Sequence, residues 1–169
     1  WTAYTEYVTK GTGTNPEVTV KGGKQWIYGG LRMGGRSYYA LDLSDVTSSG
    51  GTPKIKFKID PEAVGAPTAL THMGESWSKP LITWVNWQGK RKLVMVVGGG
   101  YDRAYESPDY AAEPSKGAGV YMFDADDGKL LWWASKHATN NATENKVGDL
   151  KYSVVSQIKA VDRNNDGLT

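Results

Sequence analysis

Cysteine is absent from the 169-residue chain. Its absence excludes disulfide bonds, thiol catalysis and a zinc centre with cysteine ligands. It does not fix the cellular compartment, because many exported bacterial proteins also lack cysteine. Long apolar runs are missing as well, since no run approaches the roughly 20 residues of a membrane-spanning helix. We therefore expect no membrane span.

An excess of charge of one sign is also missing. The formal net charge is only +2, from 20 basic and 18 acidic residues that are dispersed along the chain. A nucleic-acid-binding domain usually carries a basic stripe or patch. The sequence therefore predicts no nucleic-acid partner.

Patterns typical of catalysis are scarce. The two histidines, His72 and His137, have no carboxylate partner at a telling spacing. Ser76 and Ser78 do not lie in a nucleophile elbow, and no glycine run is followed by the Lys-Ser/Thr of a phosphate loop. We therefore expect no catalytic residue and predict that the chain is not an enzyme.

Glycine and aromatic residues are abundant, with 21 Gly, 7 Trp and 10 Tyr. Many glycines together with aromatic and β-branched residues favour short strands joined by tight turns. In the segment 53–60, Ile55, Phe57 and Ile59 alternate with three lysines, which predicts an edge strand whose lysines face solvent. Apolar patterns predict further strands at 25–30, 36–44, 79–87, 91–100, 118–126, 129–135 and 152–161.

An internal repeat organises these strands. The stretch Tyr-Tyr-Ala-Leu-Asp-Leu-Ser-Asp at 38–45 matches Val-Tyr-Met-Phe-Asp-Ala-Asp-Asp at 120–127. In each copy a strand that ends in glycines comes before, and another strand follows. Repeated units of four strands are typical of β-propeller blades. The sequence therefore predicts an all-β fold, a partial β-propeller with four-stranded antiparallel blades.

The repeat also predicts how the single propeller domain is divided over residues 1–169. We expect the end of one blade at 16–60 and a complete blade at 75–135, with a surface insertion at 101–117. Residues 152–169 are expected to form the first strand of the next blade and the start of a metal loop. Segments 61–70 and 136–152 lack an apolar helical stripe and are predicted to be connecting loops. About two blades cannot close a ring, so we expect the chain to be a piece of a larger protein.

The metal loop is predicted from the pattern D-x-[DN]-x-[DN]-G, which Asp162, Asn164, Asp166 and Gly167 match. Calcium prefers six to eight hard oxygen ligands, and alternate residues of a tight loop point inward. The three side chains and the Leu168 carbonyl are the expected ligands. The next acidic ligand would fall beyond the last residue, so this chain by itself is expected to hold calcium weakly or not at all. A turn without a metal is the alternative.

A second acidic stretch, Asp124-Ala-Asp126-Asp127-Gly, lies between two predicted strands. We interpret it as a hairpin turn without a metal. The stretch and the tryptophans after it resemble blades of quinoprotein-type propellers, where a tryptophan packs between neighbouring blades. That resemblance assigns such a role to Trp132 or Trp133 and implies no quinone cofactor.

Together, the segments 26–45, 73–102, 116–135 and 152–169 resemble the C-terminal propeller of the PilC/PilY family of type IV pilus tip-associated proteins. The resemblance spans almost the whole chain in order. It implies a distorted β-propeller with a strand-flanked calcium loop, in which Asp162, Asn164, Asp166 and the Leu168 carbonyl are ligands.

The resemblance also implies a function in pilus biogenesis and in adhesion. In that family calcium is linked to pilus extension and retraction, and hence to twitching motility. The implied partners are minor pilins at the pilus tip and a host-cell or abiotic surface. The implied location is the bacterial cell surface, reached by passage through the periplasm or outer membrane. No Arg-Gly-Asp motif occurs, so integrin binding is not supported.

Two alternatives remain open on the sequence alone. The chain could belong to a quinoprotein-type dehydrogenase, which would need a cofactor pocket on the propeller axis. It could also belong to a scaffold for outer-membrane assembly built on similar blades, although the metal-loop pattern argues against a pure scaffold.

Overall fold

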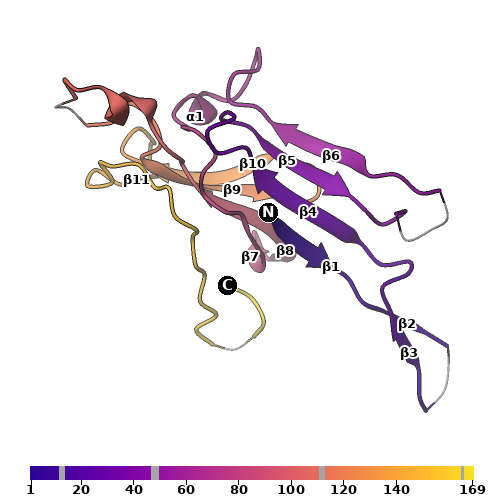
Figure 1. Cartoon of the computed structure of the whole chain (residues 1–169). Helices are drawn as coiled ribbons and strands as arrows, with labels where there is room; N and C mark the ends of the chain where they lie inside the picture. Colours follow the sequence, from indigo (N-terminus) through magenta and orange to yellow (C-terminus); the bar gives the residue numbers. More distant parts are fainter. Residues whose placement is uncertain (12–13, 47–49, 111–112, 165) are drawn as a thin grey trace.

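The computed structural model describes the chain except for residues 12–13, 47–49, 111–112 and 165. The described part is nearly all β (Figure 1). Its helical turns are α1 (Thr68–Thr71) and a 3₁₀ turn (Arg103–Glu106), which lie in segments predicted to be loops. Neither is long and apolar enough to cross a membrane, and no such helix occurs elsewhere in the described residues.

The first sheet has four antiparallel strands in the order β1-β4-β5-β6. They are β1 (Thr2–Thr5), β4 (Gln25–Gly30), β5 (Tyr38–Asp42) and β6 (Lys54–Ile59). The sequence predicted the last three and missed β1, which pairs with β4 across an intervening excursion. The sheet is therefore a four-stranded blade that begins at Thr2, earlier than the boundary expected near residue 16.

The excursion between β1 and β4 carries a two-stranded ribbon of β2 (Val8–Lys10) and β3 (Glu17–Thr19). The ribbon projects away from the first sheet (Figure 1). Its three-residue strands are too short for an alternating apolar pattern to stand out, so the sequence did not predict them.

The second sheet has five strands in the order β11-β10-β9-β8-β7. They are β7 (Leu81–Trp87), β8 (Lys90–Gly98), β9 (Gly119–Asp124), β10 (Leu130–Ser135) and β11 (Glu144–Lys146). The first four form the predicted antiparallel blade. Strand β11 lies in a predicted loop and pairs with β10 in parallel.

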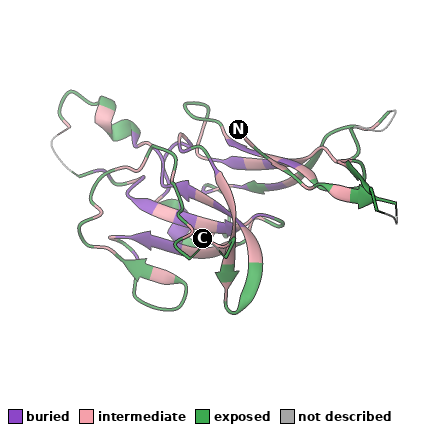
Figure 2. Ribbon diagram, turned by 90° about the horizontal axis from the view of Figure 1, so that it is seen from below, coloured by how far each residue is buried: buried purple, intermediate pink, exposed green. Residues whose placement is uncertain are grey.

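The two sheets stack in two layers (Figure 2). Their facing sides form one core of buried residues, which include Trp26, Tyr28, Tyr38, Phe57, Met95, Val97, Tyr121, Phe123 and Trp133. The Tyr28 hydroxyl donates to the Ala125 carbonyl of the other layer at 2.8 Å. Burying one such side chain contributes about 1.5–3 kcal/mol, so the shared core is what holds the layers together.

The predicted repeat agrees with this stacking. Strands β5 and β9 are the third strand of each blade. Tyr121 and Phe123 face the first sheet within the core. Their counterparts Tyr39 and Leu41 are half-buried and alternate with the core residue Ala40, so they point to the opposite side of the first sheet. Equivalent residues of both sheets therefore point in the same direction, from the second sheet toward the first and from the first sheet away from the second. Successive propeller blades require this arrangement.

Strand β6 corrects one expectation. Phe57 and Ile59 are buried, but Ile55 is 68% exposed. A shift in register between Ala40 and Leu41, where β5 pairs with β6, turns Ile55 to the other side. The same shift brings Lys56 inward, and its side chain is only 13% exposed. The prediction that all three lysines face solvent was therefore wrong for Lys56.

The predicted last strand at 152–161 was also wrong. These residues have no strand structure, and the described residues of 152–169 form an irregular segment that leaves β11 and returns to β7 at Thr169 (Figure 1). We call residues 152–169 the C-terminal arm. A strand needs a neighbouring strand for its ladder of hydrogen bonds, and among the described residues no strand pairs with 152–161. The arm is held instead at single points, such as Ser78 Oγ donating to the Ser156 carbonyl at 2.8 Å.

Candidate functional site

The predicted metal loop closes around Asp162. One carboxylate oxygen of Asp162 accepts the Gly167 N–H at 2.8 Å, and the other accepts the Asn164 N–H at 3.2 Å. Gly167 has a φ of +78°, which a glycine adopts without strain. The carboxylate of Asp162 therefore links residues 164 and 167 of the predicted metal loop.

Asp166 lies within the same loop. Its carboxylate accepts the Asn164 side-chain amide at 2.9 Å and the Leu168 N–H at 2.8 Å. The three predicted side-chain ligands are therefore linked to one another by hydrogen bonds. Asp162 is half-buried, whereas Asn164 and Asp166 are exposed.

The Leu168 carbonyl belongs to a peptide that is anchored to the second sheet. The N–H of that peptide, from Thr169, donates to the Trp84 carbonyl of β7 at 2.9 Å. In a planar trans peptide the C=O points opposite to the N–H, so the Leu168 carbonyl points away from β7. The Thr169 hydroxyl also lies 2.9 Å from the Thr83 hydroxyl. These contacts fix the end of the loop beside β7.

The donor set fits calcium in kind but supplies only part of the shell. Two carboxylates, one amide oxygen and one carbonyl are hard oxygen donors, whereas calcium takes six to eight. In the part of the chain that the structure describes, no group of three or more His, Cys, Asp or Glu residues could hold a metal. No strand precedes the loop, so the expected strand-flanked arrangement is not found on that side.

The second acidic stretch forms the predicted hairpin turn between β9 and β10. Asp124 pairs with Lys92 of β8 at 2.5 Å, and Asp126 pairs with Lys56 of the first sheet at 2.7 Å. The Lys56 ammonium also lies 3.8 Å above the Trp26 ring. Its hydrogen bond to Asp126 lowers the pKa of that carboxyl, although burial opposes the shift. Lys92 lies in the same sheet as the turn, so the turn is joined to the first sheet through Lys56 alone of these two lysines.

The tryptophans after this turn take different positions. Trp133 is in the core between the sheets, stacked on Tyr121 with ring centroids 5.8 Å apart. Trp132 is half-buried, next to Trp133 on a strand, and so points to the opposite face. Trp133 is the residue that packs between blades.

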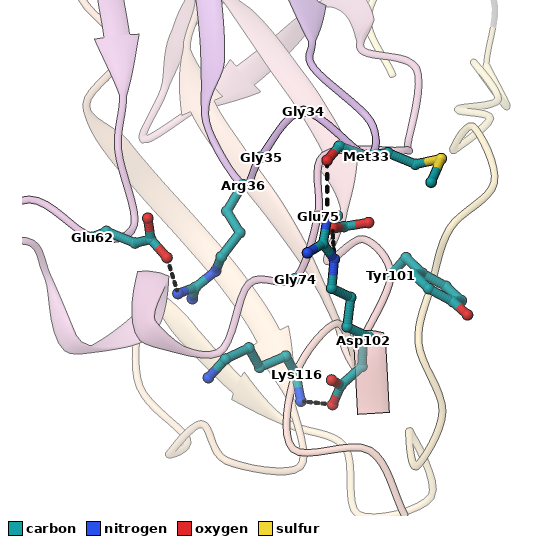
Figure 3. A pocket seen from close by; sticks show the side chains of 11 residues that line it. Met33, Gly34, Gly35, Arg36, Glu62, Gly74, Glu75, Tyr101, Asp102 and Lys116 are labelled. Carbon is teal, nitrogen blue, oxygen red and sulfur yellow. Dashed lines mark hydrogen bonds and ion pairs between the residues drawn. The ribbon is translucent and has the colours of Figure 1, made fainter. Parts of the chain in front are cut away.

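We call residues 60–80, which link β6 to β7, the connection between the sheets. A surface pocket of about 420 Å³ lies beside this connection (Figure 3). Sequence reasoning missed it because its charged residues come from three separate segments. The Glu75 side chain is 8% exposed and pairs with Arg103 at 2.5 Å. Burial raises the pKa of Asp102, but N–H donors from Ala104, Lys116 and Ser115 lower it overall. The ion pair between Glu75 and Arg103 thus joins the insertion to the connection.

The two serines that lacked a catalytic pattern have structural roles. Ser76 Oγ accepts the Leu31 N–H at 2.7 Å and donates to the Gly35 carbonyl at 3.0 Å. Ser78 Oγ accepts the Gly98 N–H at 2.9 Å. Both side chains are buried, and both fix the connection between the two sheets.

No protein-family model matches the chain, and no curated protein matches it. Among solved structures, the chain is similar to the crystal structure of the Pseudomonas aeruginosa PilY1 C-terminal domain, with a TM-score of 0.54 and 19% sequence identity. The match covers 86% of this chain and 24% of that chain, so the chain spans about a quarter of the solved domain. The fold is therefore that of part of the PilY1 C-terminal domain, which confirms the resemblance at the level of the fold.

Proposed function

We propose that the chain is part of a propeller that acts in type IV pilus biogenesis and adhesion without catalysing a reaction. The likeness of its fold to the PilY1 C-terminal domain carries this proposal. The resemblance of its sequence segments to the PilC/PilY family points in the same direction. In this role the protein acts at the pilus tip on the bacterial surface, where it contacts minor pilins and a host-cell or abiotic surface.

We further propose that residues 162–168 are the calcium loop of this propeller. Asp162, Asn164, Asp166 and the Leu168 carbonyl would hold the ion, and a further carboxylate is needed to complete the shell. The two carboxylates repel each other when no cation is bound, and a bound calcium ion neutralises them. Because Thr169 is anchored to Trp84, ordering of the loop is transmitted to strand β7.

Calorimetric titration of the full protein with Ca²⁺ tests the loop, because this chain by itself supplies only part of the calcium shell. Asp162→Ala combined with Asp166→Ala is expected to abolish binding. The matched control is Asp109→Ala with Asp149→Ala, which makes the same charge change at two exposed positions outside the loop. If the loop variant binds calcium with unchanged affinity, the calcium site lies elsewhere in the protein.

The pilus role is tested separately in the bacterium that encodes the chain. Deletion of the gene is expected to reduce surface piliation and twitching motility, and the natural gene should restore both. The gene that carries Asp162→Ala and Asp166→Ala should not restore both piliation and motility to the level that the natural gene gives. Normal piliation and motility after deletion would refute the pilus role whatever the calorimetry shows.

A further inference from the structure

The chain's two histidines lie face to face. The ring centroids of His72 and His137 are 4.2 Å apart, and the ring planes differ by 6°. Trp133 also stacks on His72, with centroids 5.9 Å apart and planes 11° apart. We call these three residues the ring stack. Trp133 is buried, His72 is half-buried and His137 is exposed, so the stack runs from the core to the surface.

The ring stack lies where four segments meet. His72 follows α1 in the connection between the two sheets, and His137 follows β10. The His72 carbonyl accepts the Gly117 N–H of the insertion at 2.8 Å. Arg36, from the loop between β4 and β5, donates to the carbonyls of Thr71 and Met73 on either side of His72. A change in the stack therefore bears on the connection, the insertion and both sheets.

Two lysines act electrostatically on the imidazoles. Lys116 of the insertion acts on His72, and Lys136 acts on His137. Within the described residues, no carboxylate forms an ion pair with either imidazole.

The carboxylates of the surrounding segments are engaged elsewhere. Glu113 pairs with Lys136 at 2.5 Å, and Glu62 pairs with Arg36 at 3.2 Å. Asp102 accepts the backbone N–H of Lys116, not its ammonium group. Glu144 of β11 lies beside Trp133 and accepts the Thr139 N–H at 3.1 Å and the Thr139 hydroxyl at 2.7 Å. Each of these carboxylates already has a partner, so a second positive charge on the stacked rings would have to compete for it.

These surroundings favour uncharged rings. Burial, then His137 and Lys116, lowers the pKa of His72 below its ordinary value of about 6.5. Burial and Lys136 likewise lower the pKa of His137. A histidine with a lowered pKa in the folded state contributes stability that is present above about pH 6.5 and is lost as the pH falls below it. Two adjacent imidazolium ions would also repel each other.

We propose that the ring stack is an acid-released clasp. At neutral pH it holds two segments against the second sheet, namely the insertion and the connection between the sheets. In mildly acidic solution it releases both. The protons that open it come from the medium, so the clasp senses the pH around the protein. This inference does not depend on the pilus or on calcium.

Nuclear magnetic resonance tests the clasp directly, because the chain has only two histidines. Titration of their ring signals gives both pKa values, and a His137→Phe variant assigns them. Phenylalanine keeps a flat ring on His72 but carries no charge. We expect both pKa values to lie below the ordinary value in the natural chain. The pKa of His72 should rise in the His137→Phe variant, since the neighbouring positive charge is gone.

Hydrogen exchange of the Gly117 amide then reports release. Its protection factor is expected to fall at least about tenfold between pH 7.5 and pH 5 in the natural chain, and less than about threefold in the His137→Phe variant. His137 is exposed, so this variant is expected to fold, which circular dichroism checks. Two independent titrations near pH 6.5, or the same loss of protection in the variant, would overturn the proposal.

Discussion

The turns at 124–128 and 162–167 have similar sequences, Asp-Ala-Asp-Asp-Gly and Asp-Arg-Asn-Asn-Asp-Gly, but different surroundings. Both end in a glycine with positive φ, +76° at Gly128 and +78° at Gly167. In the first turn, Lys92 and Lys56 neutralise two of the carboxylates. Among the described residues, no lysine or arginine forms an ion pair with a carboxylate of the second turn. Two carboxylates of the first turn are thus neutralised by the protein's own cations, whereas for the second turn we propose an external cation.

The largest expected difference concerns the two glycines. A Cβ at Gly128 would lie 2.5 Å from the Phe57 ring, whereas a Cβ at Gly167 would meet nothing within 4 Å. Gly128→Ala should therefore cost about 2–5 kcal/mol, from backbone strain plus overpacking at the sheet interface. Gly167→Ala should cost at most about 1–2 kcal/mol, from backbone strain alone. Chemical denaturation of both variants measures the difference. Equal losses would mean that the first turn does not lock the sheets together.

The next prediction contrasts the carboxylates. In the full protein, Asp162→Ala with Asp166→Ala should weaken calcium binding by about 100-fold or more, which abolishes detectable binding, because two of the charged ligands are lost. Asp124→Ala with Asp126→Ala should leave calcium affinity unchanged and should reduce stability, because two lysines lose their partners. Titration with Tb³⁺, followed by its luminescence, measures affinity in both variants. Loss of binding in the second variant would make the first turn a metal site and erase the contrast.

The sequence predicted the regular parts of the fold because their signals are local. Seven strands alternate or run apolar over at least five residues, and the repeat at 38–45 and 120–127 set their order. Strands β1, β2, β3 and β11 were missed because three or four residues carry too little pattern. The predicted strand at 152–161 failed for the opposite reason. Its apolar residues are real, but a strand also needs a partner, and a single sequence does not show one.

The candidate site divides in the same way. The hydrogen bonds that close the loop run between residues at most five positions apart, so a local pattern can indicate where such a loop lies, although whether it binds calcium stays a prediction. The anchor of Thr169 on Trp84 and the stacking of His72 on His137 join distant segments. They depend on how the sheets pack, which no local pattern encodes. On β6, Lys56 faces the core in place of Ile55 because of a bulge in the pairing with β5. This also depends on the partner strand and not on the local pattern.

A smaller effect is expected from removing one cation of the first turn. Lys56→Met keeps the apolar stem over Trp26 but loses the ion pair with Asp126, and should cost about 1 kcal/mol. The lowered pKa of Asp126 means that its contribution is present above about pH 3.8 and is lost as the pH falls below that value. The stability difference between the natural chain and the variant should therefore shrink at acidic pH.

The matched control is Lys58→Met on the same strand. Lys58 pairs with Asp60 at 2.6 Å, but its side chain is 42% exposed. Water screens such a pair, so the variant should lose less stability than Lys56→Met. Denaturation at pH 7 and pH 3 compares both variants. If the two lysines behave alike, the burial of Lys56 between Trp26 and Asp126 contributes nothing to joining the sheets.

The smallest expected effect changes sign with calcium. Asn164→Asp would give the second turn a third carboxylate and would remove the amide hydrogen bond to Asp166. Without calcium, the added repulsion should lower stability by about 0.5 kcal/mol. With calcium, the extra charged ligand should tighten binding by roughly 3- to 10-fold. Asp127→Asn in the first turn is the reverse change and should leave calcium affinity unaltered. Thermal melting with and without calcium measures both, and a loss of stability in Asn164→Asp that calcium does not reverse would argue that the second turn is a plain turn like the first.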